Sequence, residues 1–145
     1  MYSTVKLQLK IFIVVGIQLA MLTACSSGSD SNQSPQSTDL GNAVTLSWIS
    51  PVQNADGSCA HDIRGYQISF GQSVGNYTNV RTADLALGEL NCEQVDYDAI
   101  CGEIIARCSY VVDQLQPSTW YFAVQAYDDQ GHISDFSNEV YKEIL

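Results

Sequence analysis

Short runs in which apolar and polar residues alternate constrain the fold of this 145-residue chain more than any other feature. In Val44–Trp48, apolar side chains alternate with Thr and Ser, and Thr119–Tyr127 repeats the pattern with larger side chains. Successive side chains of a strand point to opposite faces, so a period of two indicates a strand with one buried face. No stretch of 12 or more residues carries a helical stripe.

Turn residues separate the strands that this pattern predicts, as Pro51 and Asn54–Gly57 do after the first of them. The expected strands are a first strand from Val44 to the turn at Pro51, then Ile63–Phe70, Asn76–Thr82, Ser109–Leu115, Thr119–Tyr127 and Asp135–Ile144. Six short strands rich in aromatic and β-branched residues predict an all-β, antiparallel β-sandwich.

An ordered set of fragments resembles a bacterial fibronectin type III domain across Ala43–Ile144. The fragments are Val44–Trp48, Asn54-x-Asp56-Gly57, Ile63-x-Gly65-Tyr66, Leu115-x-Pro117-x-Thr119-Trp120-Tyr121-Phe122-Ala123-Val124-x-Ala126 and Gly131-x-x-Ser134-x-x-Ser137-Asn138-Glu139-Val140. The resemblance implies a two-sheet sandwich that serves as a spacer or recognition module without chemistry of its own. It also implies that Trp48 is the core tryptophan.

The position that usually supplies a corner tyrosine in this family falls on Trp120 or Tyr121. The phase shared with Phe122 and Val124 points Trp120 inward, and an indole has no hydroxyl to make the tyrosine's bond.

The chain departs from the family pattern in two further places. The leading strand is expected to be short or absent, because the residues before Ala43 read as a tether. The segment Ala83–Arg107 is longer than the family's usual link, so we expect it to be a long insertion before the fifth strand. If the tether joins the Val44 strand directly, the loops 51–62, 83–107 and 128–134 lie at the opposite end of the domain.

The N-terminus has the features of an export signal. Lys6 and Lys10 precede an apolar run that ends in Leu22-Thr23-Ala24-Cys25, which resembles the lipobox of bacterial lipoproteins. The resemblance implies that residues 1–24 are a signal peptide and that Cys25 carries the lipid. An ordinary signal with an incidental Cys is the alternative. Ser26 in place of Asp implies delivery to the outer membrane of a double-membraned cell.

Residues 25–42 are expected to be the lipidated Cys and a flexible Ser-rich tether, followed by one domain over 43–145. Without the signal, sixteen acidic residues face four basic ones, a side-chain charge of −12. That charge repels phosphate backbones and anionic headgroups, so no nucleic-acid partner is expected and membrane contact is assigned to the acyl chains. The charge also favours a soluble monomer.

Four cysteines remain after Cys25, an even number in an exported chain, so two disulfides are expected. Three pairings are possible. Cys108 is in phase with Tyr110 and begins a strand near the loop that holds Cys59, which favours Cys59–Cys108 together with Cys92–Cys101. A zinc site around Cys59-x-His61 is the alternative, although no Cys-x-x-Cys pair is present.

No catalytic motif is recognisable. The two histidines, His61 and His132, fall in expected loops, and no serine lies in a G-x-S-x-G elbow, so we expect neither an enzyme nor a cofactor. Asp96-x-Asp98 with Gly102 and Glu103 lacks the spacing of an EF-hand, so no metal site is expected.

Two functions remain open. The first is a binding module that presents the insertion and its flanking loops to an envelope protein or glycan. The second is a structural spacer or assembly component of an envelope complex. For the binding module, the expected surface comprises Tyr97, Asp96, Asp98, Glu103, His61 and His132.

Overall fold

The structure is a computed structural model that describes residues 11–13, 42–54 and 56–145. The lipobox with Cys25 and almost all of the proposed signal and tether lie outside these residues. The described chain is all-β. Its strands are β1 (Ile11–Ile13), β2 (Val44–Ile49), β3 (Ile63–Gly71), β4 (Asn79–Asp84), β5 (Asn91–Asp98), β6 (Glu103–Val112), β7 (Ser118–Asp128) and β8 (Val140–Ile144).

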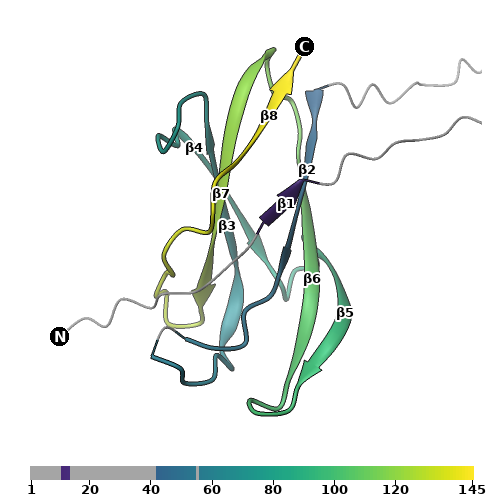
Figure 1. Ribbon diagram of the computed structural model, residues 1–145, viewed down its shortest axis with the longest axis vertical. Helices are drawn as coiled ribbons and strands as arrows, with labels where there is room; N and C mark the ends of the chain where they lie inside the picture. Colours follow the sequence, from purple (N-terminus) through teal and green to yellow (C-terminus); the bar gives the residue numbers. More distant parts are fainter. Residues whose placement is uncertain (1–10, 14–41, 55) are drawn as a thin grey trace, which may run out of the picture.

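Two four-stranded antiparallel sheets pack face to face, which confirms the β-sandwich (Figure 1). One sheet has the order β1-β2-β6-β5 and the other has the order β4-β3-β7-β8. The start of β2 and the C-terminus lie together at one end, at the top of Figure 1, and the β2–β3 loop and the β5–β6 turn lie at the other. The register of β2 with β6 agrees with this arrangement. Val44, at the start of β2, pairs with Val112 at the end of β6, and Ile49 pairs with Arg107, nearer the β5–β6 turn.

The core forms where the alternating faces of the two sheets meet. Trp48 and Tyr66 are fully buried and pack edge to face, with ring centroids 5.0 Å apart. Within the β4-β3-β7-β8 sheet, Phe70 on β3 packs against both Trp120 and Phe122 on β7. Full burial of side chains this large contributes about 1.5–3 kcal/mol each, which explains why the period-two pattern located these strands.

Gly65 belongs to the fragment that resembles the family, and the structure gives it a packing reason. It lies beside a register shift between β3 and β7. A Cβ at this position would collide with the Ala83 carbonyl oxygen on one side and the Tyr127 phenol on the other. The close approach of these neighbours therefore requires glycine.

The expectation that Ala83–Arg107 is an inserted loop is wrong. This segment holds the end of β4, a turn over 85–90, all of β5, the turn at 99–102 and the first half of β6. Ala83 is fully buried and β6 pairs with β2, so the segment is an integral part of the sandwich. The sequence did not predict β5, because every one of its residues from Asn91 to Tyr97 is exposed. Apolar and polar residues therefore do not alternate there as they do in a strand with one buried face.

The expected disulfide pairing is also wrong, although the number of bridges is right. The structure joins Cys59 to Cys101 and Cys92 to Cys108. Because β5 and β6 form a hairpin, Cys92 lies directly opposite Cys108, with their Cα atoms 4.0 Å apart. The same hairpin carries Cys101 past the end of the sheet to the loop that holds Cys59. The pairing Cys59–Cys108 with Cys92–Cys101 failed because it assumed a loop there.

The last strand begins five residues later than expected, at Val140 rather than Asp135. The preceding segment still pairs with β7 at two serines, through their backbone amides as well as their side chains. Ser134 and Ser137 each accept a hydrogen bond at Oγ from a β7 amide, that of Ala126 and that of Val124, at 2.9 Å. The amides of the same two serines donate to the Ala126 and Val124 carbonyl oxygens at 2.9 Å, so at each position the hydroxyl accepts the bond that a carbonyl oxygen accepts in a regular strand.

Candidate functional site

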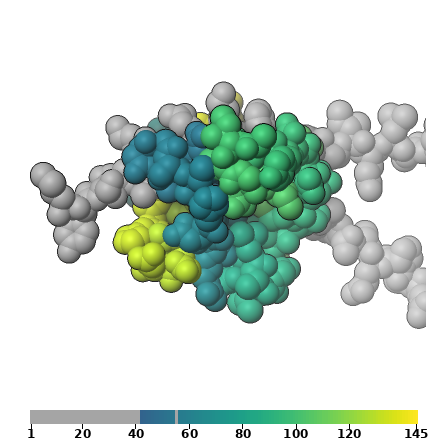
Figure 2. Space-filling model, turned by 90° about the horizontal axis from the view of Figure 1, so that it is seen from below, coloured from purple at the N-terminus to yellow at the C-terminus, as the bar shows by residue number. Residues whose placement is uncertain are grey.

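Three loops gather at the end of the sandwich away from the start of β2, and we call this the loop end. It consists of the β2–β3 loop (50–62), the β5–β6 turn (99–102) and the β7–β8 turn (129–133). Figure 2 looks onto it from below, with the blue β2–β3 loop in contact with the green β5–β6 hairpin and the yellow β7–β8 segment. The sequence predicted that loops 51–62 and 128–134 lie at this end, but the third member is the turn at 99–102 and not the whole of 83–107.

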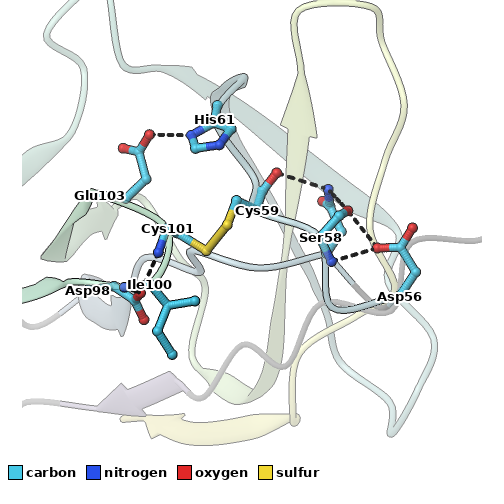
Figure 3. Close-up of a disulfide and its surroundings, with 9 residues drawn as sticks. Asp56, Ser58, Cys59, His61, Asp98, Ile100, Cys101 and Glu103 are labelled. Atoms are coloured by element: carbon cyan, nitrogen blue, oxygen red, sulfur yellow. Dashed lines mark hydrogen bonds and ion pairs between the residues drawn. A yellow bond between two sulfur atoms is a disulfide. The ribbon is translucent and has the colours of Figure 1, made fainter.

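A disulfide fastens two of these loops together. Cys101, 8% exposed, bonds to Cys59, with Cα atoms 5.4 Å apart (Figure 3). Asp98 shapes the turn before Cys101, because its Oδ1 accepts hydrogen bonds from the amides of Ile100 and Cys101 at 2.9 and 2.8 Å. Asp98 therefore acts as a turn former. A loop fixed in this way loses less entropy on binding a partner.

A second link between the same loops is the pair His61–Glu103. His61 Nδ1 lies 2.6 Å from Glu103 Oε1, and both side chains are more than a third exposed (Figure 3). An ion pair this exposed adds little stability. It does place a donor and a carboxylate at the edge of the loop end.

Behind this pair lies a cleft of about 220 Å³, which we call the hairpin cleft. It opens between the β2–β3 loop, the β4–β5 turn and the inner face of the β5–β6 hairpin. Most of its lining is apolar. The lining residues are Ser50, Pro51, Val52, Ala60, His61, Ile63, Tyr66, Leu85, Cys92, Glu103, Ile104, Ala106 and Cys108.

The outer part of the hairpin cleft is open to solvent because the hairpin extends beyond the opposite sheet. Ile104 is 54% exposed, and its cross-strand partner Tyr97 is 55% exposed. Leu85 on the facing turn is 39% exposed. Ile104 and Leu85 line the hollow and Tyr97 lies opposite Ile104 on the neighbouring strand, so these apolar side chains are clustered, as expected of a contact surface.

A second hollow of similar volume lies beside the β7–β8 turn and includes His132. His132 Nδ1 lies 2.7 Å from Asp128 Oδ2, and the His132 amide donates to Asp128 Oδ1 at 2.8 Å. Burial opposes ionisation of Asp128, but the hydrogen bonds from His132 and from the Gln130 amide outweigh it and hold the pKa of this carboxyl below its usual range. His132 therefore lies in a different hollow from His61.

The structure brings only part of the expected surface together. Glu103 and His61 meet at the mouth of the hairpin cleft, and Tyr97 adjoins it opposite Ile104. Asp98 is occupied by the turn, and Asp96 accepts a bond from the next amide along β5. The apolar lining was missed, although the spacing of Ile104, Ala106 and Cys108 already marks one face of a strand.

Among the described residues, no group of three or more His, Cys, Asp or Glu side chains could hold a metal ion. No helix in the described part of the chain is long and apolar enough to span a membrane. The arrangement at the loop end offers apolar contact area, one imidazole–carboxylate pair and several exposed carboxylates.

Neither the known protein-family models nor the curated protein sequences match this chain. Among solved structures, it is similar to astrotactin-2, described as a vertebrate-specific and perforin-like membrane protein involved in neuronal development. The TM-score is 0.49 at 16% identity over 72% of this chain. The match spans 19% of the length of astrotactin-2.

Proposed function

We propose that this chain is a lipid-anchored, non-enzymatic envelope protein whose sandwich is a fibronectin type III-like module that binds a protein or glycan at the loop end. The lipobox-like Leu22–Cys25 supports the anchor, and two disulfides among the described cysteines fit an oxidising compartment. The strand order, with β2–β6 facing β3–β7, is compatible with the immunoglobulin-like architecture that fibronectin type III modules share.

The hairpin cleft is the observation that carries the proposal. Its two walls are joined by Cys59–Cys101, its apolar lining reaches solvent at Ile104 and Leu85, and the loops that form it lie at the end away from the start of β2. An anchor at Cys25 would enter the domain through Asn42, at the opposite end, and leave this cleft accessible to a partner.

The charge around the cleft favours a protein partner with basic residues over a glycan. Segments 50–62 and 85–107 carry one basic residue, Arg107, and seven acidic ones: Asp56, Asp62, Glu89, Glu93, Asp96, Asp98 and Glu103. A complementary surface would place an apolar side chain in the cleft and Lys or Arg near its edge. Tyr97 is the one aromatic residue on which a sugar ring could stack within these segments.

Two matched variants on β6 test the site. Ile104 and Val111 are 54% and 50% exposed, but Ile104 lines the cleft and Val111 lies near the far end of the strand. We expect Ile104→Asp to abolish capture of a partner from envelope extract, and Val111→Asp to leave capture unchanged, with both proteins folded by circular dichroism. Equal capture by both variants would favour the spacer function.

The anchor is tested separately. Metabolic labelling with palmitate should mark the wild-type protein, and Cys25→Ser should lose the label and accumulate as the unprocessed precursor. Label that persists in Cys25→Ser would show that Cys25 is not the acylated residue.

A further inference from the structure

Three of the four strands at the sheet edges carry charged side chains. An edge strand presents unpaired backbone groups that can pair with another chain, and charged residues on the edge prevent this. The strands are β4 with Arg81 and Asp84, β5 with Glu93, Asp96 and Asp98, and β8 with Lys142 and Glu143. The fourth edge strand is β1, and it has no charge.

The strand behind β1 is also uncharged. β2 reads Val-Thr-Leu-Ser-Trp-Ile and has β6 on one side and β1 on the other. The pairing with β1 is antiparallel and matches Ile11 with Trp48 and Ile13 with Leu46 (Figure 1). In this structure β1 therefore covers the one edge that has no charge to protect it.

Every core side chain that the structure describes comes from β2 or from later in the chain. Among the residues whose side chains the structure describes, those of the buried hydrophobic cluster lie between Val44 and Ile144. Residues 14–43 separate β1 from β2 in the chain. A chain that lacks β1 keeps this cluster and both disulfides, so we expect it to fold on its own.

We infer that the free edge of β2 in the mature protein is an acceptor for a β-strand donated by a partner protein. The inference rests on the proposed function, because removal of residues 1–24 takes β1 away and exposes β2. The fit of Ile11–Ile13 defines the donor: an extended, uncharged, apolar segment that runs antiparallel to Leu46–Trp48. The main chain supplies the pairing, as in strand addition to other sheets.

Charge argues for a different protein as the donor and against a second copy. Two mature chains would each carry −12, and their repulsion opposes edge-to-edge pairing of β2 with itself. The tether of residues 26–42 is rich in Ser, Gln and Asn and contains Pro35, a composition that disfavours strand formation.

The edge is tested with the oxidised chain 26–145 and a synthetic peptide of residues 8–16, Gln-Leu-Lys-Ile-Phe-Ile-Val-Val-Gly. We expect saturating peptide to slow amide hydrogen exchange about tenfold or more at the alternate residues of Val44–Ile49 whose amides face away from β6, because the added strand bonds these amides. The same peptide with Phe12→Pro is the control and should leave exchange unchanged, since proline cannot donate to a ladder.

A pair of lysine variants locates the binding on the edge. Thr45 lies on β2, and its cross-strand partner Val111 lies one strand further in, on β6. Thr45→Lys should weaken peptide binding about fivefold or more, whereas Val111→Lys should change it by less than about twofold.

Three results would overturn the inference. One is slow exchange, without peptide, of the β2 amides that face away from β6, because the chain then covers its own edge. A second is a dimer with β2 protected at its interface, because the occupant is then a second copy. The third is no protection by the peptide. The proposed lipid anchor is tested independently, by the mass of the N-terminal peptide of the native protein. If residues 1–24 are still present, the anchor proposal is wrong, but the result of the peptide experiment is unaffected.

Discussion

Trp120 donates its indole N–H to the carbonyl oxygen of Gln116, four residues earlier, at 2.8 Å. A corner bond was not expected from Trp120, because the fibronectin type III domains that the sequence resembles usually donate from a tyrosine hydroxyl here. The inward phase of Trp120 is confirmed by its 8% exposure. The indole thus reaches the corner that joins 113–117 to β7 and satisfies a carbonyl there.

We expect Trp120→Phe to lower the free energy of unfolding by about 2 kcal/mol, with about 1 kcal/mol from the lost hydrogen bond and the rest from reduced packing. Urea unfolding followed by circular dichroism measures this. Tyr121→Phe, a change in the neighbouring half-buried ring, is the control and should alter stability by less than about 0.5 kcal/mol. Equal effects of the two changes would mean that the corner bond contributes nothing.

Tyr66 carries a fully buried hydroxyl with no hydrogen-bond partner among the described residues. Burial raises the pKa of this phenol to about 12. The Trp48 N–H lies close enough to favour the phenolate slightly, but it does not form a hydrogen bond with it and is itself unpaired within the described chain. Removal of an unpaired buried hydroxyl relieves its desolvation cost.

Tyr66→Phe is therefore expected to leave stability unchanged or to raise it by about 1 kcal/mol. The measurement is the urea midpoint with an unchanged slope. A loss of 1 kcal/mol or more would show that the hydroxyl has a partner, such as a buried water molecule.

The disulfide pairing is open to direct analysis. Peptide mapping without reduction should recover Cys59 joined to Cys101 and Cys92 joined to Cys108. A peptide that links Cys59 to Cys108 would contradict the structure.

The two disulfides should contribute differently to the free energy of unfolding. They close loops with sequence separations of 42 and 16. By chain entropy, replacing both cysteines with alanine should cost about 4 kcal/mol for Cys59–Cys101 and about 3 kcal/mol for Cys92–Cys108. Thermal and urea unfolding of the two double variants tests this order.

Asp84 should make the free energy of unfolding depend on pH in the acidic range. Its Oδ1 accepts a hydrogen bond from the Ala86 amide at 2.7 Å and its Oδ2 from Arg64 Nε at 2.9 Å. The Ala86 amide, and then Arg64, lower the pKa of this carboxyl below its ordinary value of 3.8. The folded state thus favours the ionised form, so this contribution is present above pH 3.8 and is lost as pH falls through the lower folded value.

We expect Asp84→Asn to be less stable than the wild type at pH 7, and the difference in urea midpoint to shrink as pH falls below 3.8. Asp113→Asn, a change at an exposed carboxylate, serves as the control. A constant difference for Asp84→Asn across this range would assign its effect to packing and not to ionisation.

The sequence determined which faces are buried. Strands β2, β3 and β7 each bury large side chains on every second position, so the pattern of Val44–Trp48 and Thr119–Tyr127 located them with errors of a residue or two. It also fixed the number of disulfides, through the even count of cysteines, and the end at which His61 and Glu103 would lie.

Tertiary structure decided the rest. Strand β5 has no buried face, so only its pairing with β6 makes it a strand, and that pairing alone determines which cysteines meet. The hairpin cleft arises because one sheet extends beyond the other, a relation between distant segments that no local pattern encodes. Backbone hydrogen bonds form between whichever strands the fold places side by side. For that reason the pairing of Ile11–Ile13 with β2 could be found only in the folded chain.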